Sequence, residues 1–97
     1  MSKRWSVLTD DMYHCYITHL PYVHIHHVFN GNRKQASEKY GFLVPLHPTL
    51  HTSGPDSVHR NPNKGLDLRL KRECQTYYEE HYGTREQFIE IFGKSYL

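Results

Sequence analysis

The sequence predicts a small α+β fold, in which a β-hairpin and a short helix are followed by two C-terminal helices. Two short segments, 22–29 and 42–46, are rich in β-branched and aromatic residues, as strands are. From residue 66 onward, apolar residues recur at three- and four-residue steps, which is the spacing of amphipathic helices. A chain of 97 residues has room for one thin core, so we expect residues 1–97 to form a single domain.

The first half of the chain is expected to supply the first strand and its flanking segments. Residues 1–14 are interpreted as an extended lead-in. In the first strand, alternation predicts that Val23, Ile25 and Val28 face inward. An Asn-Gly-Asn turn follows this strand, and the polar segment 33–39 is expected to be an exposed loop or a single helical turn.

The second half begins with the other strand of the hairpin. Pro45 lies within that strand, which places the strand at an edge or close to its own end. Proline in a first turn favours helix initiation, so a short helix is expected at 49–52, followed by a long loop over 53–65. The first C-terminal helix should end near Gly83, and a capping box at 84–87 should open the last helix.

The unusual feature of the composition is histidine, with nine in 97 residues. Neutral imidazole binds zinc and similar ions, and it also accepts a proton near neutral pH. Adjacent strand residues point to opposite sides, so in the pair His26-His27 one ring can bind an ion while the other acts as a base. We therefore predict a metal site formed by His26, His51 and His59, with His27 as the general base for phosphodiester hydrolysis.

His47 is open to two interpretations. It precedes His51 by four residues, so both could bind the same ion on one helical turn, or His47 could pair with Cys15 in a structural zinc site. Thr18 stands where such a zinc site would need another ligand, so we do not expect structural zinc. Cys15 and Cys74 are instead expected to be small buried hydrophobes, and a disulfide between them is left open. The remaining histidines are interpreted as surface residues: His14, His19, His24 and His81.

The charge pattern points to local phosphate contacts and not to a large basic surface. The formal net charge is only +2, and the candidate phosphate-binding side chains are Arg33, Lys34 and Arg60. No apolar run approaches the ~20 residues of a membrane span, and no segment has the features of a secretory signal. A cytoplasmic protein that does not contact a membrane is expected, with reduced thiols.

The order of these motifs is similar to that of a known family. His-His-Val, a turn, Leu-Val-Pro-Leu-His-Pro-Thr-Leu-His and then Ser-Val-His resemble the core of the ββα-metal (HNH-type) nucleases. The similarity is greatest to a small phage and prophage branch that includes the recombination-enhancement nucleases, and it covers residues 12–72. It implies a ββα-metal core over 15–65, followed by C-terminal helices over 66–97.

The resemblance also implies a role for each histidine of the site. The family's paired residues at the strand end, a ligand and then the general base, fall on His26 and His27. The histidine that closes the family's helix falls on His51, and the Val-His of the phage branch falls on His59. The family's central asparagine, which steadies the loop, would fall at Phe42 and is absent.

Zinc ligation is another point at which the chain departs from the family. In the wider family, two Cys-x-x-Cys motifs bind structural zinc, and the second cysteine of each is replaced here, by Thr18 and Leu50. The paired replacement is what loss of the structural zinc would produce. This agrees with the expectation drawn from the residues alone.

The function implied is a DNA endonuclease or nickase of phage or prophage origin, working in the cytoplasm of an infected or lysogenic bacterial host. It would use one divalent metal ion, with Mg, Mn, Ni and Zn as candidates. The alternative is a catalytically degenerate module of the same fold that binds nucleic acid or a host recombination or defence protein. The low net charge and the absent asparagine favour this alternative. The thin, ring-rich core is also compatible with a homodimer.

Overall fold

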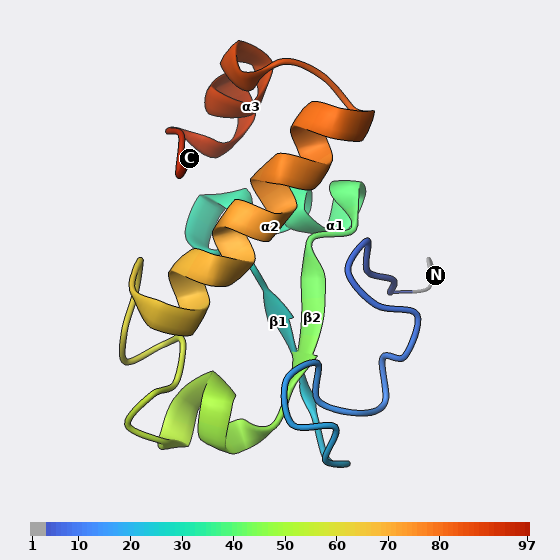
Figure 1. The fold of residues 1–97 in the computed structure, drawn as a ribbon, viewed down its shortest axis with the longest axis vertical. Coiled ribbons are helices and arrows are strands. Elements are labelled where there is room, and N and C mark those ends of the chain that lie inside the picture. The colour runs from blue at the N-terminus through green and yellow to red at the C-terminus, as the bar shows by residue number, and fades with distance from the viewer. Residues whose placement is uncertain (1–3) are drawn as a thin grey trace.

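The structure is a computed structural model that describes residues 4–97, and it confirms the predicted α+β fold (Figure 1). A two-stranded antiparallel sheet lies against helices, with two short helical elements between the strands and the others after them. The elements are β1 (His24–His27), η1 (Gly31–Arg33), α1 (Lys34–Tyr40), β2 (Leu43–Leu46), η2 (Thr49–Ser53), α2 (Gly65–His81) and α3 (Arg85–Phe92).

The two strands pair over four residues, with His24 opposite Leu46 and His27 opposite Leu43. Their connection is longer than a tight hairpin turn, because η1 and α1 lie between them. The segment 33–39, expected to be a loop or one turn, therefore contributes most of a two-turn helix. That helix ends at Gly41, whose φ of 76° is left-handed, and a Cβ there would come within 2.6 Å of the Trp5 ring.

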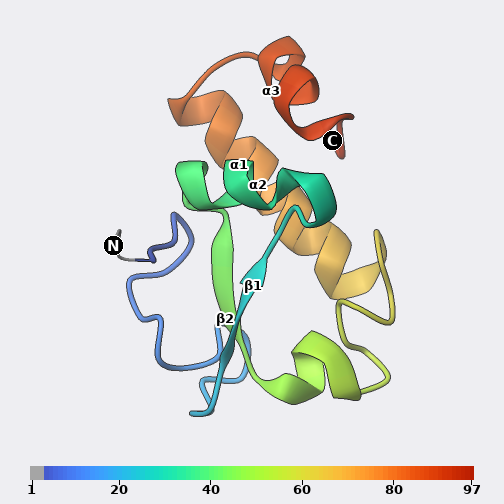
Figure 2. The ribbon, with the colours of Figure 1, turned by 180° about the vertical axis from the view of Figure 1, so that it is seen from behind.

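Helix α2 crosses one face of the sheet, in front of it in Figure 1 and behind it in the reverse view of Figure 2. It buries Leu70, Cys74 and Tyr78, which lie four residues apart as the predicted apolar stripe requires. The core beyond α2 consists largely of aromatic rings from the segments around β1, β2 and α3. These rings are Phe29, Phe42, Phe88 and Phe92.

The segment 4–16 runs along the free edge of β2 (Figure 1). The Tyr16 N–H donates to the Pro45 carbonyl at 2.9 Å, and the Val7 N–H donates to the Gly41 carbonyl at the same distance. Pro45 is therefore in an edge strand, as predicted, but that edge is covered. Cys15 and Cys74 are both buried and free, so the two thiols are not joined by a disulfide.

The end of the chain matches the predicted capping chemistry. The Thr84 side chain accepts from the Gln87 N–H, and the Gln87 side chain accepts from the Thr84 N–H, which makes a complete capping box at the start of α3. Helix α2 ends at His81, and the Gly83 N–H bonds back to the Tyr78 carbonyl at 3.0 Å. Within residues 4–97, no helix combines the length and the apolar character needed to cross a bilayer.

Candidate metal centre

Three of the predicted ligands come together in space. One ring nitrogen from each of His26, His51 and His59 lies within 4.8 Å of the corresponding atoms of the other two. His26 comes from β1, His51 from η2, and His59 from the loop that follows η2. Three imidazoles from separate segments can therefore hold one metal ion.

His26 occupies the inward position of β1. Its side chain is 2% exposed, whereas Ile25 before it and His27 after it are only partly buried. The prediction that Ile25 faces inward in place of the histidine is therefore wrong, while Val28 is buried as expected. Burial, followed by the neighbouring His51 and His59, lowers the pKa of His26 to about 3, so its ring is neutral at physiological pH.

His51 is positioned by η2, which is a single wide helical turn. The turn closes through a hydrogen bond from the Gly54 N–H to the Thr49 carbonyl, five residues back. Such π-type turns are rare and are frequently found at functional sites. Burial, followed by His59 and His24, lowers the pKa of His51 to about 4.

His59 is held against His51 by the backbone. The Val58 N–H donates to the Leu50 carbonyl at 2.8 Å, and the His59 N–H donates to the His51 carbonyl at 3.2 Å. The segment predicted as a long loop is therefore attached to η2 and is well defined at this point. As a result, the Nε2 atoms of His51 and His59 lie 3.1 Å apart. The His59 residue is exposed, and its side chain lines the cleft beside His51.

The geometry and chemistry of this group fit a metal ion. Zinc binds imidazole nitrogen at about 2.0–2.1 Å in tetrahedral geometry, which places two such nitrogens about 3.3–3.4 Å apart. The 3.1 Å separation in His51–His59 is close to that value. His26 Nε2 is also buried without a hydrogen-bond partner among the described residues, which is costly unless another group satisfies it.

A buried ion pair lies behind His26. The Asp67 Oδ2 atom accepts from Lys71 Nζ at 2.9 Å and from the Asn63 N–H at 2.6 Å, and both charged side chains are almost fully buried. The other carboxylate oxygen, Oδ1, is 4.0 Å from His26 Nε2. At 4.0 Å this contact is too long for a hydrogen bond, so Asp67 leaves His26 Nε2 unpaired.

His27 borders the same cleft, which has a volume of about 290 Å³. Its Nε2 lies 3.7 Å from the Glu38 carboxylate. Burial lowers the pKa of His27 and the charges of Arg4 and Lys34 add to this effect, whereas Glu38 opposes it. The ring is thus able to accept a proton near neutral pH. The residues that line the cleft are Arg4, Ile25, His26, His27, Asn30, Lys34, His51 and His59.

The segment after β1 is fixed by Ser37. Its buried hydroxyl donates to the Phe29 carbonyl at 2.7 Å and accepts from the Phe29 N–H at 3.1 Å, two residues beyond His27. Phe42, at the position where the resemblance implies an asparagine, is buried in the aromatic core. A serine on α1 thus makes the loop-fixing hydrogen bonds, and Phe42 contributes to packing.

Three predicted site residues lie outside this cleft. His47 Nδ1 is 2.9 Å from the Thr49 hydroxyl and accepts from the Thr49 N–H at 3.3 Å, so this ring nitrogen is bonded to the first residue of η2. Arg33 extends toward Gly93 at the end of α3, and Arg60 is exposed and does not line the cleft. Of the three predicted phosphate-binding cations, the cleft contains Lys34.

Sequence reasoning missed three residues that contact the site. Arg4 and Glu38 form an ion pair at 3.3 Å beside His27, but nothing in the sequence links residues so far apart. His24 was interpreted as a surface residue, and it is exposed, yet its Nδ1 lies 2.9 Å from His51 Nδ1. The two-residue period of a strand could have revealed it, since His24 and His26 share one face.

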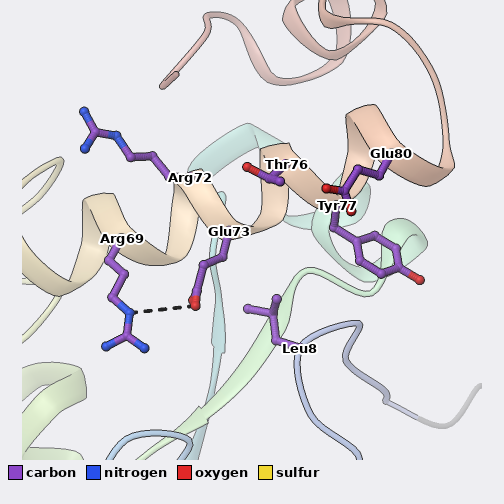
Figure 3. Close-up of a pocket in the computed structure, with 7 residues that line it drawn as sticks. All are labelled: Leu8, Arg69, Arg72, Glu73, Thr76, Tyr77 and Glu80. Carbon is purple, nitrogen blue, oxygen red and sulfur yellow. Dashed lines mark ion pairs between the residues drawn. The ribbon is translucent and has the colours of Figure 1, made fainter.

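A second depression, of about 440 Å³, lies between the lead-in and the exposed face of α2 (Figure 3). Its charged groups include the ion pair Arg69–Glu73, whose atoms are 3.7 Å apart. None of the predicted site residues lines it. The cleft with the histidines is therefore the better candidate for chemistry, even though it is smaller.

The same cleft contains three convergent imidazoles, a fourth histidine able to accept a proton, and two cationic side chains. Its chemistry is suited to an anionic substrate that binds beside a metal ion. Comparison with protein-family models, with curated proteins and with solved structures finds no match to this chain.

Proposed function

We propose that this protein is a divalent-metal-dependent DNA endonuclease or nickase. The observation that carries the proposal is the convergence of His26, His51 and His59 in one cleft with His27 and Lys34. Metal-assisted hydrolysis of a phosphodiester needs a cation site, a base for the attacking water and cationic contacts to phosphate. Residues suited to each of these tasks border this cleft.

The three imidazoles would hold the ion. When bound, a divalent ion supplies Lewis-acid polarisation of the phosphate and stabilises negative charge on the leaving oxygen. Mg, Mn, Ni and Zn are the candidates. Neutral nitrogen donors suit Zn and Ni, whereas Mg prefers oxygen ligands. The three imidazoles therefore favour Zn and Ni.

His27 would act as the general base. His27 is adjacent in sequence to His26 and lines the same cleft, but its ring nitrogens do not belong to the ligand group. Glu38, 3.7 Å from Nε2, is placed to stabilise the imidazolium that forms when His27 takes a proton from water. Proton transfer of this kind typically contributes 10²–10⁴-fold to a rate, as an order of magnitude.

Phosphate contacts would come from Lys34 and Arg4, the two cationic side chains that line the cleft. The proposed substrate is DNA, and the motif resemblance supports a phage or prophage origin and action in the cytoplasm of a bacterial host. A homodimer is part of the same proposal, since several large side chains are exposed, with Tyr13 at 79% and Tyr22 at 84%.

A second candidate function is a non-catalytic module that binds nucleic acid or a host recombination or defence protein. The observation that favours it is the scarcity of positive charge. The net charge is only +2, and some of the cationic side chains are neutralised by ion pairs within the fold. Lys71 is buried against Asp67, and Arg69 pairs with Glu73. These pairs leave fewer cations for phosphate contacts, which favours the form of this candidate that binds a host protein.

A plasmid-nicking assay with metal-free protein and added Mg²⁺, Mn²⁺, Ni²⁺ or Zn²⁺ distinguishes the two functions. We expect cleavage with at least one ion, and a loss of roughly 10²-fold or more in His27→Ala. His14→Ala, which removes an exposed histidine from the lead-in, is the matched control and should cleave like the wild type. If the wild type cuts neither single- nor double-stranded DNA with any ion, the enzyme proposal fails and the binding module stands.

A further inference from the structure

His24 makes a direct contact with the candidate metal centre. It is the first residue of β1, two positions before His26, so the two side chains lie on the same face of the strand. Its Nδ1 atom is 2.9 Å from His51 Nδ1, and the two rings meet edge to face with centroids 5.0 Å apart. That is the distance of a hydrogen bond between two ring nitrogens.

The contact of the second ring nitrogen of His51, Nε2, shows which of the two histidines donates the hydrogen bond between His24 and His51. His51 Nε2 faces His59 Nε2 at 3.1 Å, so it is the nitrogen that belongs to the ligand group. A ligating nitrogen must carry a lone pair, and a neutral imidazole has its single proton on the other nitrogen. His51 must then be protonated on Nδ1, and this N–H donates to His24 Nδ1.

The contact has no evident structural role other than orienting His51. His24 is exposed, and it is outside the hydrophobic core that holds the hairpin to α2. Its effect is therefore confined to the tautomer and the angle of the His51 ring. Ligating histidines commonly donate their second N–H to an outer partner, and loss of that partner typically lowers metal affinity.

We propose that His24 is a positioning residue of the metal centre, which accepts the Nδ1–H of His51 and so directs His51 Nε2 toward the ion. The inference rests on the metal binding proposed above, but it makes a separate claim about the metal-free protein. In that state too, His51 should carry its proton on Nδ1 and His24 should carry its proton on Nε2.

The first experiment measures these tautomers without any metal. Two-bond proton–nitrogen correlation spectra of metal-free, nitrogen-labelled protein near pH 7.5 report which ring nitrogen is protonated. We expect the Nδ1–H form for His51 in the wild type, and a shift toward the Nε2–H form in His24→Leu. If His51 carries its proton on Nε2 in the wild type, the inference is overturned, whatever the metal data show.

The second experiment titrates Zn²⁺ and Ni²⁺ into three proteins by calorimetry. His24→Leu removes the acceptor and should weaken binding by about 10- to 100-fold. His24→Asn places an amide oxygen near the position of the ring Nδ1 and should restore most of the affinity. His81→Leu, an exposed histidine at the C-terminal end of α2, is the control and should bind as the wild type does.

The outcomes separate the two proposals. Equal affinity in His24→Leu and the wild type overturns the positioning role and leaves metal binding intact. If His24→Asn is as weak as His24→Leu, an oxygen acceptor does not suffice, and the positioning role is overturned in favour of direct ligation by the His24 ring. If the wild type binds neither ion, and neither Mn²⁺ nor Mg²⁺ in the same titration, the proposed metal-dependent function fails, and the tautomer spectra alone decide the role of His24.

Discussion

His51 and His59 bring their Nε2 atoms to within 3.1 Å of each other across a segment of eight residues. The close approach is imposed by the backbone, since the His59 N–H donates to the His51 carbonyl. Two imidazoles held together in this way, with His26 buried beside them, form a nitrogen-rich site before any ion binds.

The stability of the metal-free protein should depend on pH. The pKa values of His26 and His51 are lowered from 6.5 to about 3 and about 4, so the unfolded chain binds more protons than the folded one between those values. The stabilising effect of neutral rings is complete above pH 6.5 and is lost as the pH falls toward 4 for His51 and toward 3 for His26. His26, which is deeply buried, can contribute up to about 1.4 kcal/mol per pH unit in this window, and the partly exposed His51 contributes less.

Urea unfolding at a series of pH values measures this effect. Most carboxylates titrate near or below about pH 4.3, so the change between pH 5 and 6.5 reports mainly on histidine. The variant His51→Asn should show a shallower dependence, because one depressed group has been removed. A free energy of unfolding that stays constant from pH 7 to 5 would contradict the buried, neutral state of His26.

Ser37→Ala should destabilise the protein by about 1–3 kcal/mol. The substitution leaves the N–H and the carbonyl of Phe29 without the hydroxyl that pairs with both. Ser53→Ala is the matched control, because its exposed hydroxyl bonds only to the Pro48 carbonyl, and it should cost less than about 0.5 kcal/mol. Equal stabilities of the two variants in urea unfolding would show that the Phe29 segment does not depend on Ser37.

Gly54→Ala should disrupt the turn that carries His51. A Cβ at this position would lie 2.2 Å from the Thr49 carbonyl oxygen, which is backbone and belongs to the turn itself. We expect a loss of about 1–3 kcal/mol in the free energy of unfolding, together with weaker metal binding. Thr52→Ala, an exposed substitution in the same turn, should change neither quantity. If Gly54→Ala matches Thr52→Ala in both measurements, η2 is not the element that positions His51.

Lys34 and Arg33 are neighbours in sequence but should differ in their contribution to DNA affinity. Lys34 lines the histidine cleft, whereas the Arg33 guanidinium lies beside Gly93. Lys34→Ala should weaken DNA binding and reduce the slope of log affinity against log salt concentration by about one, as the loss of one phosphate contact does. Arg33→Ala should have a smaller effect on both quantities. A larger loss in Arg33→Ala, measured by fluorescence anisotropy at several salt concentrations, would place the DNA on another surface.

Much of the fold could be predicted because its elements follow local rules. The apolar stripe of α2 has helical spacing, and the capping box at Thr84 has a recognisable local pattern. Helix α1 was less predictable, since its polar sequence does not show a core-facing stripe. Its end depends on the left-handed Gly41 packed against Trp5, and its buried Ser37 bonds to Phe29, and both are contacts between distant segments.

The sequence could predict which histidines form the site, but it could not predict the residues that surround them. His26, His51 and His59 stand out because imidazole is rare and chemically specific, so their grouping could be inferred from sequence. The roles of Arg4 and Glu38 depend on how the lead-in and α1 pack beside His27, which no local pattern encodes. His24 is less predictable, because its sequence position indicates only an exposed strand residue and does not reveal the contact with His51.

The central claim is that three histidines bind a single metal ion, and calorimetric titration of the metal-free protein with Zn²⁺ and Ni²⁺ tests it most directly. We expect one ion per chain, and a loss of affinity of at least about 10-fold in His59→Ala, whose exposed side chain can be removed without harm to the core. The control His81→Ala should bind as tightly as the wild type. No heat of binding with either ion, or equal affinity in His59→Ala and the wild type, would contradict the claim.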